Sequence, residues 1–203
     1  MELRSYGLID VLKRNAALFP DRAAFVFGER RVTHAEYLAR VERLSGALAA
    51  EGIAPGDRIV VVADNGPEFV ELYGAAAWLG AIVVPVNWRL SGDEIAYIVG
   101  DATSKIVVAS GSHQETFRSS RAEFARVHRW IGIGEASGQF VGIATLLDKA
   151  SAATKPHGEA GPFAMIHTAA VGGRPRGALL TQANLIANAA QARKGPLEPL
   201  APR

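Results

Sequence analysis

The chain has 203 residues, of which 49% are hydrophobic and 21% are charged, a composition typical of a soluble globular protein. Its 22 Lys and Arg outnumber its 20 Asp and Glu by only two, so the charge balance does not indicate a nucleic-acid-binding protein. This length can bury one sizeable core or two small ones.

The sequence contains no cysteine, which excludes disulfides, thiolate catalysis and cysteine-based zinc sites and fits a reducing compartment. The N-terminus lacks the apolar core of a signal peptide. The longest apolar stretch, residues 75–86, is interrupted by Gly80 and Pro85 and is too short for a membrane helix. The histidines have no metal-ligand spacing, and the acidic residues form no pair typical of acid–base catalysis. We therefore expect a cytoplasmic protein with no membrane span, no metal site and no catalytic residue in this chain.

The first fifty residues predict a helix, a hairpin and a second helix. Apolar residues recur at helical spacing over residues 8–19, and the pattern stops at Pro20. A short hairpin over residues 23–32 follows. Thr33 and Glu36 then have the spacing of a capping box, which predicts a helix that runs to about Glu51.

Residues 59–63, 81–85 and 105–109 are apolar, β-branched runs, as expected of strands buried on both faces of a parallel sheet. Between them, Asp64 or Asn65 is predicted to cap a helix with Pro67 in its first turn, and Ser91 with Glu94 forms a second capping box. This alternation predicts an α/β fold with a mostly parallel β-sheet flanked by helices.

The signals are weaker between residues 110 and 162. We predict a helix over about residues 116–127, a short strand over residues 130–133 and a helix over residues 144–150. Residues 151–162 are small, polar and rich in Gly and Pro, which indicates an exposed connection and a possible subdomain boundary.

Residues 163–180, FAMIHTAAVGGRPRGALL, run from an apolar segment through a basic, Gly-bearing loop into a second apolar segment. This order is typical of a phosphate-binding loop between two buried strands, because backbone N–H groups and a cation together cradle phosphate. The alternative is a basic, solvated turn. His167, which precedes the loop, either touches a substrate or is held by a hydrogen bond at the strand end, and we favour the second interpretation.

The run LGAIVVPVNWRL at residues 79–90, followed by EIAYI at residues 94–98 and by Asp101, resembles the N-terminal region of adenylate-forming acyl-CoA synthetases of the AMP-binding superfamily. Residues 33–37, 56–58 and 65–69 fall where that family has similar residues, so the resemblance covers essentially the whole chain. A dinucleotide-binding Rossmann domain is a weaker alternative, because no Gly-rich fingerprint follows the strand at residues 59–63.

The signature loop of that family reads Thr, Ser, Gly, Thr, Thr, Gly, a variable residue, Pro, Lys and Gly, and it wraps the β- and γ-phosphates of ATP. In this chain Arg176 stands in place of the Lys, and residues 169–172 depart from the pattern. The resemblance therefore implies a degenerate phosphate loop. Its expected nucleotide-binding residues are Thr168, Gly172, Gly173, Arg174, Arg176 and Gly177.

The departures remove three hydroxyls from the loop, at residues 169, 171 and 172. Hydrogen bonds to charged groups contribute about 1.5–3 kcal/mol each, so the loss could amount to several kcal/mol of phosphate binding where water does not substitute. Ala170 replaces a Gly and adds a cost of about 1 kcal/mol if that position needs a positive φ.

The resemblance implies that the parent protein is an ATP-dependent carboxylic acid–CoA ligase. Such an enzyme takes a fatty or aryl acid, ATP with Mg²⁺, and CoA, and forms an acyl-adenylate and then an acyl-CoA. In the family, the acidic residues that hold ribose and metal, the acyl pocket and the C-terminal domain with its catalytic Lys come later than Arg203. We therefore expect residues 1–203 to be a partial N-terminal domain that does not adenylate an acid by itself. The alternative is a truncated or degenerate, non-catalytic member that binds partners or self-associates through surface left uncovered.

Overall fold

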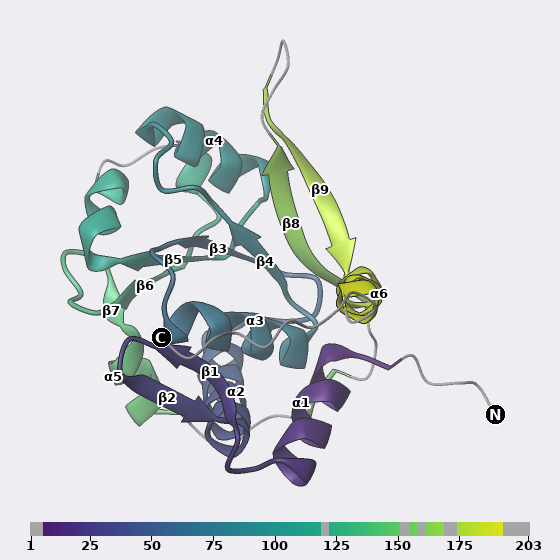
Figure 1. The fold of residues 1–203 in the computed structure, drawn as a ribbon. Helices are drawn as coiled ribbons and strands as arrows, with labels where there is room; N and C mark the ends of the chain where they lie inside the picture. The colour runs from purple at the N-terminus through teal and green to yellow at the C-terminus, as the bar shows by residue number, and fades with distance from the viewer. Residues whose placement is uncertain (1–5, 119–121, 151–154, 158–160, 169–173, 193–203) are drawn as a thin grey trace.

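The computed structural model describes residues 6–118, 122–150, 155–157, 161–168 and 174–192. A seven-stranded sheet forms the centre of the molecule, in the order β7-β6-β5-β3-β4-β8-β9 (Figure 1). The strands are β3 (Arg58–Val62), β4 (Ile82–Pro85), β5 (Ile106–Ser110), β6 (Arg129–Ile133), β7 (Val141–Gly142), β8 (Pro162–Thr168) and β9 (Arg176–Thr181).

Every pairing in this sheet is parallel except the antiparallel pair of β8 with β9. Helices cover both faces of the sheet, so the predicted α/β fold with a mostly parallel sheet is confirmed (Figure 1). The helices are α1 (Leu8–Leu18), α2 (His34–Ala50), α3 (Pro67–Leu79), α4 (Gly92–Asp101), α5 (Ile143–Asp148) and α6 (Gln182–Ala192).

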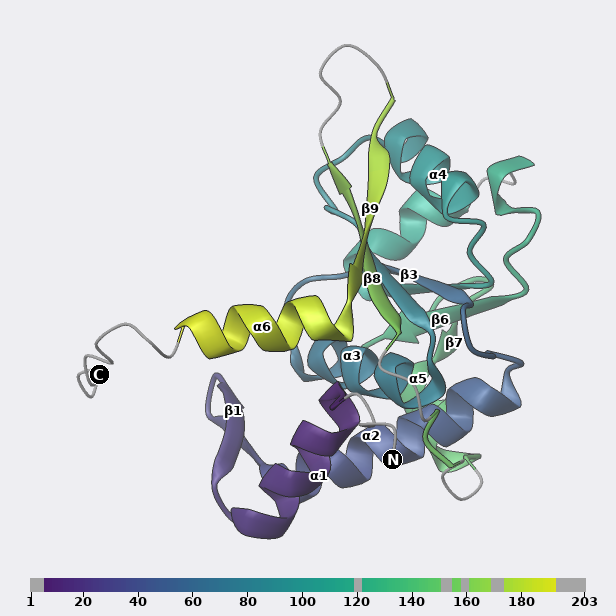
Figure 2. The same ribbon diagram turned by 90° about the vertical axis from the view of Figure 1, so that its right-hand side faces the viewer.

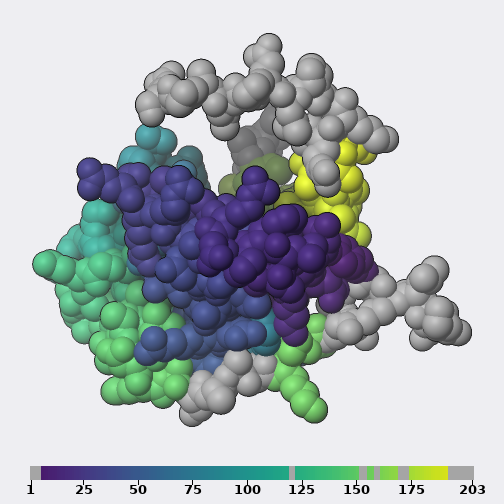
Figure 3. All heavy atoms as spheres, turned by 60° about the horizontal axis from the view of Figure 1, so that its bottom comes forward, coloured from purple at the N-terminus to yellow at the C-terminus, as the bar shows by residue number. Residues whose placement is uncertain are grey.

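A separate two-stranded hairpin, β1 (Ala23–Phe27) with β2 (Arg30–Thr33), follows α1, as the sequence predicts. Figure 3 shows this hairpin and α1, in purple and blue, lying over the side of the molecule that α2 occupies. The segment from α1 to β2 therefore forms an outer layer against the helices that cover one face of the sheet.

Side chains from successive positions of β3 enter two different cores. Ile59 and Val61 pack with α1, α2, α3 and α5 on one face of the sheet. Val60 and Val62 pack with α4 and the short helical turns on the other face. All four side chains are at most 1% exposed, because the central strand of a doubly covered sheet has no solvent face.

Two of the predicted helix caps are confirmed and one is wrong. Thr33 Oγ1 accepts a hydrogen bond from the Glu36 N–H at 3.2 Å, and Ser91 Oγ accepts one from the Glu94 N–H at 3.3 Å. The N-cap of α3 is Gly66 rather than Asp64 or Asn65. Proline occupies the first position of α3, where its fixed φ suits the helix and its missing N–H needs no acceptor, so the residue directly before it becomes the cap.

The helix predicted over residues 116–127 is also wrong. The structure has two 3₁₀ turns there, η1 (Gly111–Phe117) and η2 (Ala122–Phe124). The rings of Phe117 and Phe124 lie 5.5 Å apart, and both pack on the Trp130 ring of β6. Packing of these large aromatic side chains outweighs the helix propensity of the segment.

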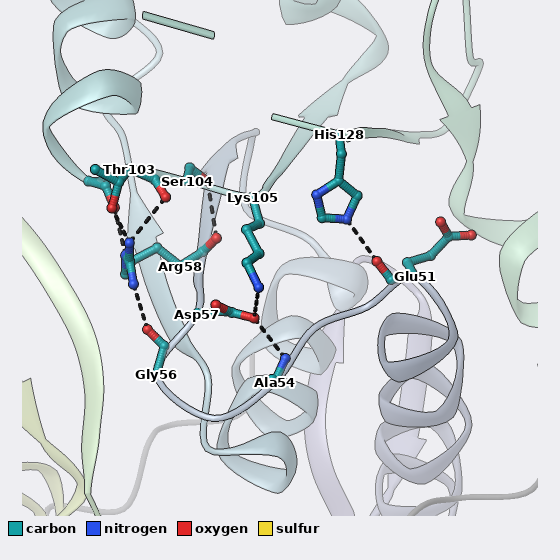
Figure 4. A network of polar contacts seen from close by, with 10 residues as sticks. Glu51, Ala54, Gly56, Asp57, Arg58, Thr103, Ser104, Lys105 and His128 are labelled. Atoms are coloured by element: carbon teal, nitrogen blue, oxygen red, sulfur yellow. Dashed lines mark hydrogen bonds and ion pairs between the residues drawn. The ribbon is translucent and has the colours of Figure 1, made fainter. Parts of the chain in front are cut away.

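Side chains tie together the ends at which β3 and β5 begin, and Figure 4 shows this network. Arg58 donates hydrogen bonds to the carbonyls of Ala102 at 2.6 Å and Gly56 at 2.8 Å. Next to it, Lys105 Nζ lies 2.8 Å from Asp57 Oδ2. The two Arg58 contacts satisfy backbone carbonyls in the turns that lead into the central strands.

Strand β9 lies at the end of the sheet order, and residues 176–180 in it are exposed. The sequence predicts two buried strands around the basic loop, and for β9 this prediction is wrong. The apolar side chains Leu179 and Leu180 are 49% and 41% exposed.

Candidate functional site

The predicted phosphate loop closes the hairpin of β8 and β9. The strands pair from Pro162 with Thr181 to Thr168 with Arg176, next to the loop. β8 also pairs with β4 at Val83 and Ala164, so the hairpin continues the central sheet. Figure 2 shows that the end of the hairpin next to the loop lies beside α4. Residues 169–173, which include the expected site residues Gly172 and Gly173, lie outside the described part of the chain.

Helix α4 holds the hairpin on both sides of the loop. His167 Nε2 of β8 lies 2.9 Å from Asp101 Oδ2, and the Tyr97 hydroxyl donates to the Pro175 carbonyl at 3.2 Å. The guanidinium of Arg174 lies 5.2 Å from the centre of the Tyr97 ring, a cation–π contact. The interpretation of His167 as a histidine hydrogen-bonded at a strand end is confirmed.

Gly177 lies on the side of the hairpin that carries Met165 and His167. A Cβ at Gly177 would come within 2.8 Å of Met165 Cγ and Sδ and within 3.3 Å of His167 Cε1. A glycine at this position therefore lets the histidine and the methionine lie close to β9. The structure thus supplies a packing reason for Gly177, beside any contact with phosphate.

Thr168 and Arg176 face each other across the hairpin, directly below the loop. The Thr168 hydroxyl donates to the Arg176 carbonyl at a long 3.5 Å, and both residues are exposed. Arg174 is exposed as well. The described flanks of the loop thus offer two guanidinium groups and one hydroxyl to a ligand, and Arg pairs well with phosphate oxygens because its donors form a planar fork.

A groove of about 660 Å³ lies beside the hairpin, between α3, β8 and α6. Most of its lining is apolar, and it comprises Leu8, Tyr37, Phe69, Val70, Tyr73, Phe163, Ala164, Ile166, Leu180, Thr181, Asn184, Leu185 and Asn188. The Tyr37 hydroxyl donates to the Val70 carbonyl at 3.0 Å, and burial raises the pKa of Tyr37 well above its usual range. The Tyr37 hydroxyl is therefore uncharged at physiological pH, and the side chain forms part of the lining of the groove.

A second hollow, of about 430 Å³, lies where β3 and β4 end. Trp88 in its lining is 39% exposed, stacks on His113 with ring centres 5.2 Å apart, and carries the Arg89 guanidinium 4.3 Å from its ring centre. The carboxyl ends of parallel strands are where α/β sheets bind ligands, so this hollow adjoins the usual ligand side of the sheet.

Neither a metal-ion cluster nor a membrane helix is found in the described parts of the chain. Within residues 6–118, 122–150, 155–157, 161–168 and 174–192, no three His, Asp or Glu side chains are grouped so that they could hold a metal ion. Over the same described ranges, no helix is both long and apolar enough to span a bilayer.

The sequence of the chain matches the model of a known family. The sequence profile of AMP-binding enzymes matches residues 12–200. This chain belongs to the AMP-binding enzyme family. The loop between β8 and β9 thus occurs in a member of a nucleotide-using family, and the predicted resemblance to that superfamily is confirmed.

Curated relatives of this chain are named as acid–CoA ligases or synthases. It is 31% identical over 188 residues to a feruloyl-CoA synthase of Amycolatopsis sp, an alignment that covers 92% of the chain and 35% of that relative. It is 30% identical over 179 residues to the long-chain-fatty-acid–CoA ligase FadD13 of Mycobacterium tuberculosis, covering 84% of the chain and 34% of the ligase. The chain thus spans about a third of the length of the curated relatives it matches.

Solved structures support the same assignment. A Rhodopseudomonas palustris protein described as a long-chain-fatty-acid CoA ligase matches with a TM-score of 0.86 and 41% identity, over 95% of this chain and 49% of that protein. A Mycobacterium tuberculosis fatty acyl CoA synthetase matches with a TM-score of 0.83 and 29% identity, over 95% of this chain and 38% of that synthetase.

Reasoning from the sequence missed the two α4 residues that hold the hairpin. Tyr97 and Asp101 lie four residues apart, so a helix places them on one face. That spacing was the available signal, but nothing in the sequence tells that this face meets residues 167 and 175, more than sixty positions later.

Proposed function

We propose that this AMP-binding chain is part of an ATP-dependent carboxylic acid–CoA ligase, which forms an acyl-adenylate and then an acyl-CoA thioester. The observation that carries the proposal is the basic loop at the end of the β8–β9 hairpin, in a chain that belongs to the AMP-binding family. The names of its relatives, feruloyl-CoA synthase and long-chain-fatty-acid–CoA ligase, support the same reaction class.

In this proposal the loop binds the β- and γ-phosphates of ATP through Thr168, Gly172, Gly173, Arg174, Arg176 and Gly177. Phosphate binding by such a loop combines backbone N–H groups with cationic side chains. Arg174 and Arg176, one on each side of Pro175, supply the cationic part. Because three loop hydroxyls of the family pattern are absent, the guanidinium groups carry a larger share of the phosphate contacts than in a loop that keeps them.

Mg²⁺ belongs to the proposed reaction as the partner of ATP, and the described residues contain no group of three or more acidic or histidine side chains that could hold it. Protein sites for Mg²⁺ draw on one or two carboxylates together with substrate phosphates. Asp101 is the carboxylate of α4 nearest the described loop flanks, and it is paired with His167. We therefore assign no Mg²⁺ ligand to this part of the chain.

The acid in this proposal is a fatty or aryl carboxylic acid and the thiol is CoA. The names of the relatives refer both to an aryl acid (feruloyl) and to long-chain fatty acids. They therefore support the chemical class of the acid and not one particular acid. The absence of cysteine fits a reducing compartment, and we place the reaction in the cytoplasm.

The test uses the complete gene product and ATP-dependent release of pyrophosphate with fatty and aryl acids. We expect pyrophosphate release that depends on acid and ATP, and a KM for ATP that rises about tenfold or more in Arg176→Ala, because a phosphate loses a charged partner. Arg118→Ala is the matched control, since Arg118 is 69% exposed and pairs with Glu115 in a turn away from the hairpin.

Two results would overturn the proposal. The first is a complete gene product that releases no pyrophosphate with any acid offered, and the second is an unchanged KM for ATP in Arg176→Ala. Residues 1–203 alone are expected to release none, because one third of a relative's length holds only part of such an enzyme. Release by the isolated chain would contradict that expectation.

A further inference from the structure

The phosphate loop is anchored on both of its flanks by one helix. His167 stands directly before Thr168 in β8, and Pro175 stands directly before Arg176 in β9. Both make a hydrogen bond to α4, at 2.9 Å to Asp101 and at 3.2 Å to Tyr97. A loop whose two ends are fixed has fewer conformations to lose when a ligand orders it.

The Asp101–His167 contact fixes the orientation of the imidazole. The His167 side chain is only 3% exposed, whereas the Asp101 side chain is 39% exposed and stays in contact with water. An ionised carboxylate only accepts hydrogen bonds, so the ring nitrogen that faces it, Nε2, carries the proton. The other nitrogen, Nδ1, is buried and has no hydrogen-bond partner among the described residues. Among the described residues, the hydrogen bond that holds the ring therefore comes from α4.

The Tyr97 contact fixes the opposite flank of the loop. The hydroxyl of Tyr97 lies 3.2 Å from the Pro175 carbonyl and 3.5 Å from Asp101 Oδ1, so the two α4 residues also touch each other. Arg174 packs its guanidinium on the Tyr97 ring at 5.2 Å. One turn of helix thus holds a β8 residue, the Pro175 backbone and one of the two arginines that flank the loop.

α4 is suited to serve as this support because it is itself well fixed. Its apolar face, Ile95, Ile98 and Val99, is at most 2% exposed and packs in the core on its side of the sheet. Its start is capped by Ser91. The missing side chain of Gly177 leaves room for the imidazole to lie against β9.

We propose that Tyr97, Asp101 and His167 form a clamp that positions the phosphate loop for ATP, with α4 as its rigid support. The three are positioning residues: none is assigned a contact with the reacting atoms. The inference rests on the proposed function, since it names how the same loop is held ready for a triphosphate. Pre-positioning acts on the binding of ATP and its alignment rather than on the acid or CoA.

The test measures steady-state kinetics of the complete gene product with Asp101→Ala, His167→Ala and Tyr97→Phe. We expect the KM for ATP to rise about tenfold in Asp101→Ala, with a smaller rise in Tyr97→Phe and unchanged KM values for acid and CoA. His167→Gln is the rescue variant, because its side-chain amide can still donate to Asp101, and it should recover much of the loss seen in His167→Ala.

Asp101→Ala and His167→Ala should not add in the double variant, because both remove the same contact. Asp57→Ala is the matched control: it removes the 2.8 Å ion pair with Lys105 at the opposite end of the strands and should leave the KM for ATP unchanged. An active wild-type protein whose KM for ATP does not move in Asp101→Ala would overturn the clamp.

A second measurement tests the clamp independently of catalysis. Amide hydrogen exchange is followed in this chain over residues 164–168 and 176–181, and we expect it to be about fivefold faster in Asp101→Ala than in wild type and in Asp57→Ala. Equal exchange in all three proteins would overturn the clamp. A wild type without ATP-dependent activity but with faster exchange in Asp101→Ala would instead overturn the proposed function and leave the clamp as a property of the fold.

Discussion

The central strands and the β8–β9 hairpin belong to one sheet but differ in what surrounds them. β3 and β5 are covered by helices on both faces, and the side chains of residues 59–62 are at most 1% exposed. β9 has a similar number of apolar side chains, yet Leu179 is 49% exposed. An apolar run therefore predicts a strand in both places, but burial depends on elements that the run itself does not specify.

Two substitutions that shorten a side chain, one on each strand, test this contrast, and the first is expected to have the largest effect. Ile59→Ala on β3 should lower the free energy of unfolding by about 2–5 kcal/mol, because it opens a cavity in a closed core. Leu179→Ala on β9 should change it by less than about 0.5 kcal/mol, because the side chain is already half in water. Urea denaturation of both variants measures the difference, and equal losses would show that β9 is buried in solution.

A second prediction concerns the ion pair that ties α2 to α3. Glu71 is 1% exposed and makes two hydrogen bonds with the Arg40 guanidinium, whose side chain is 34% exposed. Glu71→Ala should cost roughly 2–3 kcal/mol of unfolding free energy, less than for a fully buried pair because Arg40 can reach water. Asp148→Ala breaks the exposed pair with Arg43 and is the control, with an expected cost below about 0.5 kcal/mol.

Acid should weaken the capping boxes before it affects the apolar core. The backbone N–H of Thr33 holds the pKa of Glu36 below its usual range. A carboxylate with a depressed folded-state pKa stabilises the fold above its unfolded pKa, and this contribution disappears as pH falls through the folded value. Glu36→Gln should therefore be less stable than wild type at neutral pH and show a shallower loss of stability in acid. Parallel pH profiles of the two proteins would contradict this.

The smallest effect on stability and the clearest effect on association are expected at the edge of the sheet. We predict that the chain self-associates through β9, whose apolar side chains are exposed and whose outer edge pairs with no strand among the described residues. Leu179→Lys should weaken that association while changing the unfolding free energy by less than about 0.5 kcal/mol. Sedimentation over a range of protein concentrations checks it, and a wild-type chain that stays monomeric throughout would refute it.

Local patterns predicted the strands β3, β4 and β5 and the caps at Thr33 and Ser91, although not the cap of α3, because the relevant forces act within a few positions. The β-branched runs of β3, β4 and β5 predict strands by themselves. The caps at Thr33 and Ser91 depend on a partner only three residues away. Between residues 110 and 130 the deciding contact is an aromatic cluster with Trp130, so the helix prediction failed.

The candidate site likewise has a part that the sequence predicts and a part that it does not. The loop could be found from its glycines, its prolyl turn and its arginines, because these are adjacent in the sequence. The partner of His167 could not be found, because Asp101 lies 66 positions earlier and only the fold, which puts α4 beside the hairpin, brings the two together. The family assignment is confirmed, whereas the phosphate contacts of the loop stay a prediction.

A hydrogen bond joins the first and last described helices. The Leu8 N–H at the start of α1 donates to Gln182 Oε1 at the start of α6 at 2.8 Å, across 174 positions. The amide side chain is buried, with 3% exposure. During synthesis α1 must therefore wait for most of the chain before this partner exists, roughly 10–35 s at ribosomal speed. The N-terminal helix is made first but completes its packing among the last.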